Sequence, residues 1–266
     1  MATLRMFQVD SFAAVPFTGN PAGVCVTPEP LAEDLMRAIA AELNCSETAF
    51  LVPHGEAWQL RWFTPSTEVD LCGHATLASA HILWEAGHLA PERTARFHTR
   101  SGELRCDRQA DGWIAMDFPA QPPQPLEQTA ALSDLLGTPV VALATTPIGY
   151  WVAELTDEAA VRACEPDQGR LAALDCSGLV VTALAGAANV RVVSRFFAPR
   201  LGIAEDPVTG SAHCALAPYW QPRCGDRWLA RQVSARGGLV RVECRGERVL
   251  LAGQALTTMR IDLQLP

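Results

Sequence analysis

Apolar residues gather most densely in two stretches of the chain, and each stretch begins at a glycine. Gly73 opens the run His74–Ala86, which is apolar on nearly every side of a helix, and Gly87 follows it. Gly210 opens a second run, which continues to about Trp220. A helix that is apolar all round is typical of the interior of a domain. The pattern therefore predicts two buried helices, the first of which ends at a C′ glycine.

The remaining hydrophobic pattern has shorter periods. Between Leu31 and Leu43 a leucine or isoleucine recurs at every fourth position, which predicts an amphipathic helix, and Asn44 supplies a stop signal. The segment 16–23 is rich in glycine and proline and is expected to be a loop. Shorter helices are expected at 127–136, 158–163 and 168–174. Strands are expected at 6–12, 24–26, 47–52, 58–63, 95–99, 103–107, 113–118, 140–144, 150–155, 178–184, 189–197, 231–235, 238–244, 248–252 and 256–263.

The two halves of the chain resemble each other. The sequence Arg-Trp-Phe-Thr-Pro at 61–65 matches Arg-Phe-Phe-Ala-Pro at 195–199, and an acidic turn and a glycine-led helix follow each copy. The matching glycines, Gly73 and Gly210, are three residues further apart than the two arginines, so the second copy carries three extra residues. A repeat at half the chain length predicts two similar domains related by a pseudo-two-fold axis. Each would wrap a curved, mainly antiparallel sheet around one central helix, which is an α+β fold.

Four prolines between positions 119 and 125 mark the expected boundary between the halves. We expect the N-terminal half to cover residues 1–120 and the C-terminal half to cover residues 121–254. The final strand, about 255–266, could return to the N-terminal half.

Composition and charge narrow the classes of protein to consider. A length of 266 residues, with 49% hydrophobic and 19% charged residues, is enough for a sizeable core. The net charge of −8 argues against a nucleic-acid backbone or an anionic membrane as partner. We see no signal-peptide pattern, and no apolar run approaches the roughly 20 residues of a spanning helix. A cytoplasmic location is therefore expected.

Lysine and cysteine usage exclude several kinds of chemistry. All 21 basic residues are arginine, which excludes a pyridoxal-phosphate Schiff base, a Walker lysine and a catalytic lysine. The nine cysteines are scattered and none forms a Cys-x-x-Cys pair, which weakens zinc-ribbon and thioredoxin interpretations. His74, His81 and His88 are spaced by seven, but no further ligand pattern accompanies them. We therefore expect no metal site.

The two glycine turns are the strongest candidates for chemistry. The first N–H groups of a helix have no partner within the helix, and the helix dipole is positive there, so a helix start can hold a carboxylate or an oxyanion. We expect the helix starts at Gly73 and Gly210 to face each other across a cleft. A small anionic metabolite would bind between them as the substrate.

Many segments, in the same order along the chain, are similar to those of one known family. The matching segments are 10–12, 16–21, 44–50, 61–65, 68–76, 194–199, 205–213, 217–220 and 234–238. On these residues the chain resembles the phenazine-biosynthesis PhzF-like isomerase family, which has the diaminopimelate-epimerase-like fold. The resemblance implies two halves that each form a curved sheet around a helix, with the active site between them. It also implies a homodimer that uses no cofactor.

The resemblance also assigns roles to residues. In the characterised isomerase of the family, the glutamate of the Ser-Glu-Thr-Ala motif is the catalytic acid and base, and it corresponds to Glu47 here. Asn20 lies in an early matching segment and is expected to bind substrate. The other groups expected around the substrate are His74, Asp206 and Ser211, together with the amides of Gly73 and Gly210.

Each of these side chains also has a structural interpretation. Asp206 precedes Pro207 and could serve only as a turn residue, or it could bond the substrate or orient His74. A helix start directly before His74 should lower its pKa, which favours a neutral imidazole that can donate to a developing enolate. Ser211 could cap its own helix, bind a substrate carboxylate, or do both.

Cys72 raises the alternative of a thiol mechanism, because in the related epimerases two cysteines form the proton-transfer pair. Such a pair requires a second cysteine at the other glycine turn, where Thr209 stands instead. Cys214 lies a full turn into the second helix and is expected to pack in the core.

The sequence leads to one main hypothesis and two alternatives. The main hypothesis is a cofactor-independent isomerase in which Glu47 moves a proton between carbons of a small carboxylate substrate. The first alternative is an epimerase or racemase of an amino acid or a hydroxy acid. The second is a non-catalytic homodimer that binds a metabolite.

Overall fold

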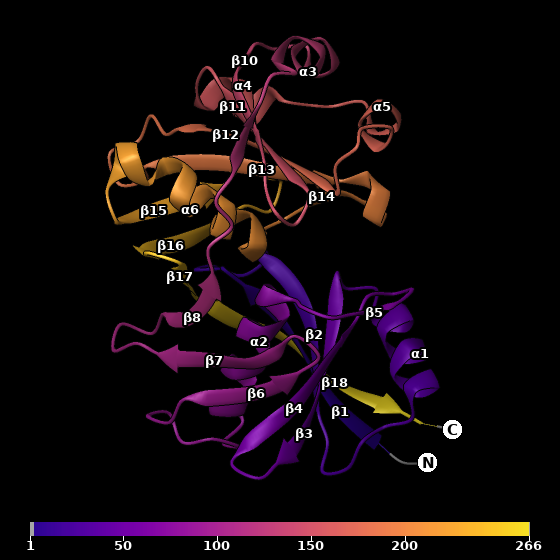
Figure 1. Cartoon of the computed structure of the whole chain (residues 1–266). Helices are drawn as coiled ribbons and strands as arrows, with labels where there is room; N and C mark the ends of the chain where they lie inside the picture. The colour runs from indigo at the N-terminus through magenta and orange to yellow at the C-terminus, as the bar shows by residue number, and fades with distance from the viewer. Residues whose placement is uncertain (1–2, 266) are drawn as a thin grey trace. The chain divides into compact units, whose positions relative to one another are not determined.

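The computed structural model describes residues 3–265, which form two compact units (Figure 1). Unit 1 consists of Met1–Asp117 and Ala252–Pro266, and unit 2 consists of Phe118–Leu251. Each unit contains its own sheet and its own buried helix, and each is described by itself below.

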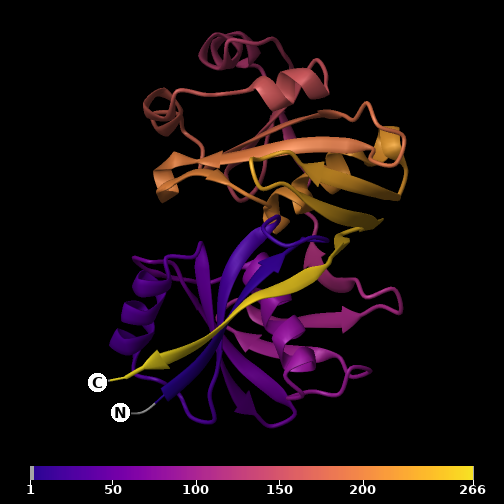
Figure 2. The same ribbon diagram turned by 180° about the vertical axis from the view of Figure 1, so that it is seen from behind.

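The sheet of unit 1 is mainly antiparallel. Its strands are β1 (Thr3–Ser11), β2 (Asn20–Val26), β3 (Glu47–His54), β4 (Ala57–Phe63), β5 (Glu68–Val69), β6 (Ala95–Thr99), β7 (Gly102–Arg108), β8 (Ile114–Pro119) and β18 (Ala255–Gln264). They pair in the order β18-β1-β2-β3-β4-β6-β7-β8, and β5 pairs with the end of β4. Among these pairs of described residues, β2–β3 and β4–β6 are parallel and the others are antiparallel. Figure 2 shows β18, in yellow, running beside the indigo β1.

The sheet of unit 2 repeats this pattern. Its strands are β9 (Gln124–Leu126), β10 (Val140–Thr145), β11 (Tyr150–Leu155), β12 (Gly178–Leu184), β13 (Val192–Ala198), β14 (Ile203–Asp206), β15 (Arg227–Gln232), β16 (Gly238–Arg245) and β17 (Arg248–Gly253). From β10 to β16 the pairs are antiparallel, parallel, antiparallel, parallel and antiparallel, as they are from β1 to β7. β14 pairs with β13 as β5 pairs with β4. The predicted α+β fold with two pseudo-symmetric halves is confirmed.

One buried helix occupies the equivalent place in each unit. In unit 1 it is α2 (Gly73–Glu85), and in unit 2 it is α6 (Gly210–Cys224). The side chains of α2 are buried on every side, because strands β1, β2, β3, β7 and β18 all pack against it. Such complete burial suits a helix without charged residues before its last position. Gly87 follows α2 with a φ of 76°, as expected of a glycine after a helix.

The smaller helices lie on the outside of the sheets. In unit 1, α1 (Glu33–Leu43) packs Met36 and Ile39 against Phe50 and Phe63 of the sheet, and it ends at Asn44 in the left-handed conformation. The smaller helices of unit 2 are α3 (Thr129–Leu136), α4 (Glu158–Ala163) and α5 (Gln168–Ala172), with a 3-10 turn at Pro199–Leu201.

A repeated ion pair joins the strand before each buried helix to the segment that leads into that helix. In unit 1, Arg61 Nε donates to Glu68 Oε1 at 2.7 Å, and the guanidinium lies over the Phe63 ring. In unit 2, Arg195 Nε donates to Glu205 Oε1 at 2.7 Å. The three extra residues of the second copy fall between the partners of this pair, where the Pro199–Leu201 turn lies. The ion pair is therefore present in both units despite the three extra residues in the second.

Several predicted element boundaries were wrong. The expected loop 16–23 ends earlier, because residues from Asn20 onward pair with β1 and residues from Ala22 onward also pair with β3. Part of the proline-rich boundary segment forms β9, an edge strand, where a proline without an N–H is tolerated. The strand expected at 231–235 is β15 at Arg227–Gln232, whose buried residues alternate from Trp228. The second buried helix continues beyond Trp220.

Among residues 3–265, no helix is long and apolar enough to cross a membrane.

Gly253, which follows the end of unit 2 and belongs to unit 1, yields a test of the packing around α2. A Cβ atom at Gly253 would lie 2.3 Å from Cδ1 of the buried Phe12 ring and 3.0 Å from Leu77 of α2. We expect Gly253→Ala to lower the free energy of unfolding by about 1–3 kcal/mol, measured by urea denaturation. Gly186→Ala is the control, because its Cβ would meet only one atom, at 3.7 Å. Equal stability of the two variants would contradict this account of the packing.

Candidate functional site

Glu47 is the first residue of β3 and lies beside the parallel strand β2, opposite Ala22. Its side chain is largely buried, with 12% of its surface exposed. The preceding helix α1 ends at Asn44, so the chain turns within two residues and enters the sheet at Glu47. A carboxylate at this point is held by a paired strand, which gives it a defined position in unit 1.

His74 lies in the first turn of α2 and meets Glu47. Its Nε2 atom is 3.2 Å from Glu47 Oε2, and the imidazole is buried. The helix start is held in place by Ser11 of β1, whose hydroxyl donates to the His74 carbonyl at 2.7 Å. Two residues that the sequence predicts as catalytic are thus neighbours in the structure.

His74 is neutral at physiological pH, because burial lowers its pKa to about 3. The sequence predicts this neutral form but attributes it to the helix start, whereas desolvation is the cause in the structure. A neutral imidazole has one nitrogen that donates and one that accepts a hydrogen bond. Its two nitrogens therefore play different roles toward their neighbours.

Cys72 is the N-cap residue of α2, and its sulfur lies 3.4 Å from Nδ1 of His74. Cys72, His74 and Glu47 thus form a continuous buried chain. A donor atom from each lies within 4.8 Å of the others, so the three could in principle approach a metal ion. Each imidazole nitrogen already has a neighbour, however, and a metal would have to displace one of them. The contact between Cys72 and Nδ1 is a hydrogen bond, whereas Nε2 of His74 has no hydrogen-bond partner among residues 3–265. The expected absence of a metal site stays a prediction.

Asn20 and Gly73 are the other predicted site residues of unit 1. Asn20 is fully buried at the start of β2, and its Oδ1 atom accepts a hydrogen bond from Ser46 at 3.2 Å. This contact holds the residue that precedes Glu47. Gly73 is partly exposed at the first position of α2, where the helix amides have no intrahelical partner. Their roles in binding substrate stay predictions.

In unit 2 Asp206 belongs to a compact hydrogen-bonded group at the start of α6. The Thr209 hydroxyl donates to its carboxylate. Gln232 is fully buried, accepts from the Thr209 amide at 2.9 Å and donates to the Asp206 carbonyl at 2.7 Å. Asp206 is therefore held by α6 and β15 together and is more than a turn residue before Pro207.

Ser211 does not cap its own helix, contrary to one interpretation of the sequence. Thr209 is the N-cap residue, and α6 has no side-chain cap. The Ser211 hydroxyl instead lies 3.2 Å from the hydroxyl of Tyr150, which begins β11. Gly210 is buried at the first position of α6.

Cys214 packs in the core, as expected. It is 5% exposed, and burial raises the pKa of its thiol to about 12. This thiol is therefore unsuited to act as a base, and unit 2 offers no cysteine at the N-cap of α6.

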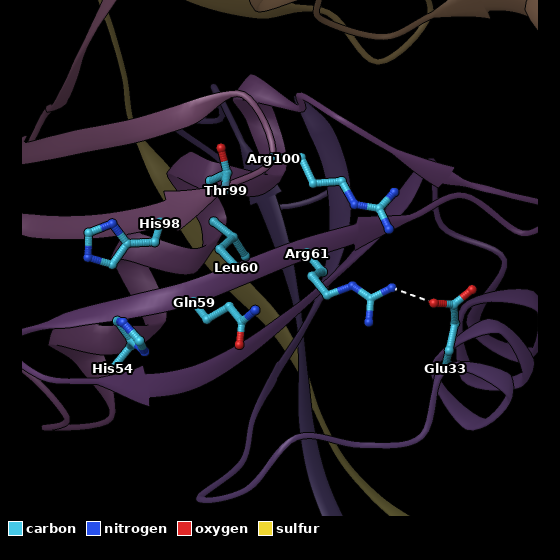
Figure 3. Close-up of a pocket in the computed structure, with 8 residues that line it drawn as sticks. All are labelled: Glu33, His54, Gln59, Leu60, Arg61, His98, Thr99 and Arg100. Atoms are coloured by element: carbon cyan, nitrogen blue, oxygen red, sulfur yellow. Dashed lines mark hydrogen bonds and ion pairs between the residues drawn. The ribbon is translucent and has the colours of Figure 1, made fainter.

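A pocket of about 550 Å³ lies elsewhere in unit 1 (Figure 3). It is lined by Glu33, His54, Gln59, Leu60, Arg61, His98, Thr99 and Arg100. None of the predicted site residues lines it. Both guanidiniums already bind carboxylates, because Arg61 pairs with Glu33 and Glu68, and Arg100 pairs with Glu68. The pocket thus has little free positive charge for an anionic substrate.

Sequence reasoning missed three residues that contact predicted site residues. Gln232 and Tyr150 are far from Asp206 and Ser211 in the chain, and no motif marks them. Thr209 was considered only as the residue that replaces a second cysteine. The internal repeat could have marked Thr209 as a site residue, because Thr209 occupies the position that Cys72 occupies in the first copy.

Comparisons with known proteins agree with this fold. A family model described as phenazine biosynthesis-like protein matches residues 9–260. An uncharacterized isomerase of Pseudomonas aeruginosa is 50% identical, with 95% of each chain covered. An uncharacterized isomerase of Halalkalibacterium halodurans is 43% identical over the whole of both chains. A crystal structure of a phenazine biosynthesis protein of the PhzF family from Enterococcus faecalis has a TM-score of 0.94 and 39% identity, and covers 99% of this chain and 100% of its own.

The fold and these relatives define the class of the protein, which is an isomerase. The names of these two isomerases give no substrate. The chain belongs to the phenazine biosynthesis-like protein family.

The buried state of His74 leads to a prediction about stability and pH. The folded imidazole stays neutral down to a pKa of about 3, while the unfolded one protonates near 6.5. The unfolded state thus binds more protons, so stability falls as the pH drops from 7 to 5, by about 2 kcal/mol for this residue. We expect His74→Gln to lose about 2 kcal/mol less than the wild type over this range, measured by denaturation at both pH values. The exposed His54→Gln is the control, and equal losses in all three proteins would contradict the prediction.

Proposed function

We propose that the protein is a cofactor-independent isomerase that moves a proton between carbons of a small carboxylate substrate, with Glu47 as the general acid and base. One observation carries the proposal: the largely buried Glu47 carboxyl lies 3.2 Å from the buried neutral imidazole of His74. A carboxylate that is held beside a polar group is suited to take a proton from carbon and to return it.

The proposed reaction begins when Glu47 removes a proton from a carbon next to the substrate carboxylate. The bonding electrons pass into the adjacent unsaturated system, and the anion that forms is stabilised by the amides at the start of α2, which include that of Gly73. Glu47 then returns the proton to another carbon, so atoms and charge balance. The contact with Glu47 supports a role for His74 in orienting the carboxylate, beside the expected donation to the anion.

The residues of unit 2 are proposed to bind polar groups of the substrate. Asp206 would accept a hydrogen bond from a hydroxyl or an amine, and Ser211 and the Gly210 amide would bind a carboxylate. Their support is the placement of Asp206 by Thr209 and Gln232, and of Ser211 beside Tyr150.

Epimerisation and metabolite binding without turnover are the competing functions. An epimerase would change optical rotation without moving a double bond, and a binding protein would take up no deuterium. The two-thiol version of epimerisation is disfavoured by Thr209 at the N-cap of α6. A small anionic metabolite as ligand, a homodimeric state and a cytoplasmic location belong to the same proposal.

The first test replaces the proposed acid and base. In D₂O, with a panel of amino acids, hydroxy acids and unsaturated carboxylic acids, the wild type should incorporate deuterium into at least one compound. Glu47→Gln keeps the size of the side chain but cannot accept the proton, so deuterium uptake should fall by at least about 100-fold. Mass spectrometry measures the uptake.

The matched control is Glu56→Gln, which removes an exposed carboxylate from the turn after β3. Its uptake should equal that of the wild type. Undiminished uptake in a folded Glu47→Gln variant would rule out the role assigned to Glu47.

The second test addresses independence from a cofactor. Dialysis against EDTA should leave deuterium uptake unchanged, because the proposed proton transfer uses only groups of the chain. Loss of uptake that a divalent metal restores would contradict this proposal and would point to the donor atoms of Glu47, Cys72 and His74.

A further inference from the structure

Cys72 has no role in the proposed reaction, yet its position relative to His74 is well defined. The thiol is 7% exposed, and its sulfur lies 3.4 Å from Nδ1 of a histidine whose other nitrogen meets Glu47. The two neighbours of the imidazole differ in kind, because a carboxylate only accepts hydrogen bonds, whereas a thiol can donate one.

The segment that carries the thiol is anchored. The Cys72 carbonyl accepts from the Thr76 amide at 3.1 Å and from the Thr76 hydroxyl at 2.6 Å. The His74 carbonyl accepts from Ser11. Both ends of the thiol–imidazole contact thus belong to a helix start that is fixed by other bonds. The contact is therefore a property of the fold and does not depend on a mobile side chain.

Two arrangements of the protons are compatible with these distances. In the first, the Cys72 thiol donates to Nδ1, and Nε2–H faces the Glu47 carboxylate at 3.2 Å without completing a hydrogen bond. In the second, Nδ1–H donates to sulfur, and a protonated Glu47 donates to Nε2. Sulfur is a weak acceptor, whereas an N–H that faces a carboxylate oxygen at 3.2 Å is attracted by its charge. In the first arrangement the thiol is a donor rather than an acceptor, and the N–H faces the charged carboxylate, so this arrangement is favoured.

We propose that Cys72 is a positioning residue whose thiol donates to Nδ1 of His74 and so keeps the N–H of the imidazole on Nε2, directed at Glu47. The N–H then faces the carboxylate at 3.2 Å, and this electrostatic attraction stabilises the ionised form, which is the form that removes a proton. This consequence for catalysis rests on the proposed function, whereas the proton arrangement itself does not.

The equivalent N-cap position in unit 2 carries a hydroxyl group in place of a thiol. There Thr209 occupies the N-cap, and its hydroxyl donates to Asp206. Its carbonyl accepts from the ring of His213, four residues later, as the Cys72 carbonyl accepts from Thr76. Both N-cap side chains thus contact a predicted site residue, and each does so with a hydrogen-bonding group.

Nitrogen NMR at pH 7 tests the proton arrangement without any substrate. The ring nitrogens of His74, in the ¹⁵N-labelled protein, are identified by their loss in His74→Gln, because the chain has six histidines. We expect the wild type to show a protonated Nε2 and an unprotonated Nδ1. In Cys72→Ala the Nδ1 signal should move downfield, toward the position of a ring nitrogen that accepts no hydrogen bond.

Two further variants complete the test. Cys72→Ser keeps a donor and should restore the Nδ1 signal toward its wild-type position. Cys25→Ala, which removes another buried thiol of unit 1, should leave it unchanged. A protonated Nδ1 in the wild type, or an unmoved Nδ1 signal in folded Cys72→Ala, would overturn the proposal. If Cys72→Ala does not fold, the proposal is tested by the His74 tautomer in the wild type and in Cys72→Ser. A protonated Nδ1 in either protein would then overturn it.

The catalytic consequence has its own readout. In the deuterium assay, Cys72→Ala should lower kcat about tenfold with little change in KM, which corresponds to the loss of about one hydrogen bond. An unchanged kcat together with the expected NMR result would reject the consequence and keep the proton arrangement. Failure of Glu47→Gln to lose activity would reject the proposed function without altering the NMR result.

Discussion

The burial of one helix in each unit along most of its length is the constraint on which the rest of the structure depends. A helix such as α2 cannot be covered by a single face of a flat sheet, because its side chains point outward in all directions. The strands of unit 1 therefore curve until β1, β2, β3, β7 and β18 all touch it. Only the ends of the helix remain for contact with anything else, and the N-terminal end presents amide groups. Both candidate groups of residues lie at such an end.

Much of the fold follows from patterns that are local or periodic. The two glycine-led apolar helices, the stop at Asn44 and the internal repeat each leave a signal within a short window, and the structure confirms them. Strand boundaries are harder to predict from the sequence, because they depend on which other strand a segment pairs with. Asn20 belongs to a strand through its pairing with β1, despite a glycine- and proline-rich context. β15 begins earlier than its pattern suggests for the same reason.

The candidate site likewise contains some residues that the sequence predicts and others that it does not. Glu47 and His74 stand out because of the motifs around them, and their neighbouring positions agree with that emphasis. The contact of Tyr150 with Ser211 and that of Gln232 with Asp206 join residues far apart in sequence, and neither residue type is unusual for a strand. Such contacts arise only when the sheet brings its strands together. The cause of the neutral state of His74 is likewise tertiary, since burial rather than the helix start lowers its pKa.

The place of β18 has a consequence for the order in which the chain matures on the ribosome. Unit 2 is one continuous stretch, whereas unit 1 takes its β18 from beyond unit 2. Unit 2 is therefore complete in the emerging polypeptide before β1 can acquire its outer neighbour. Until that moment β1 presents an open edge, and open strand edges attract other chains. In this protein the last residues to be synthesised are therefore needed to complete the unit that begins the chain.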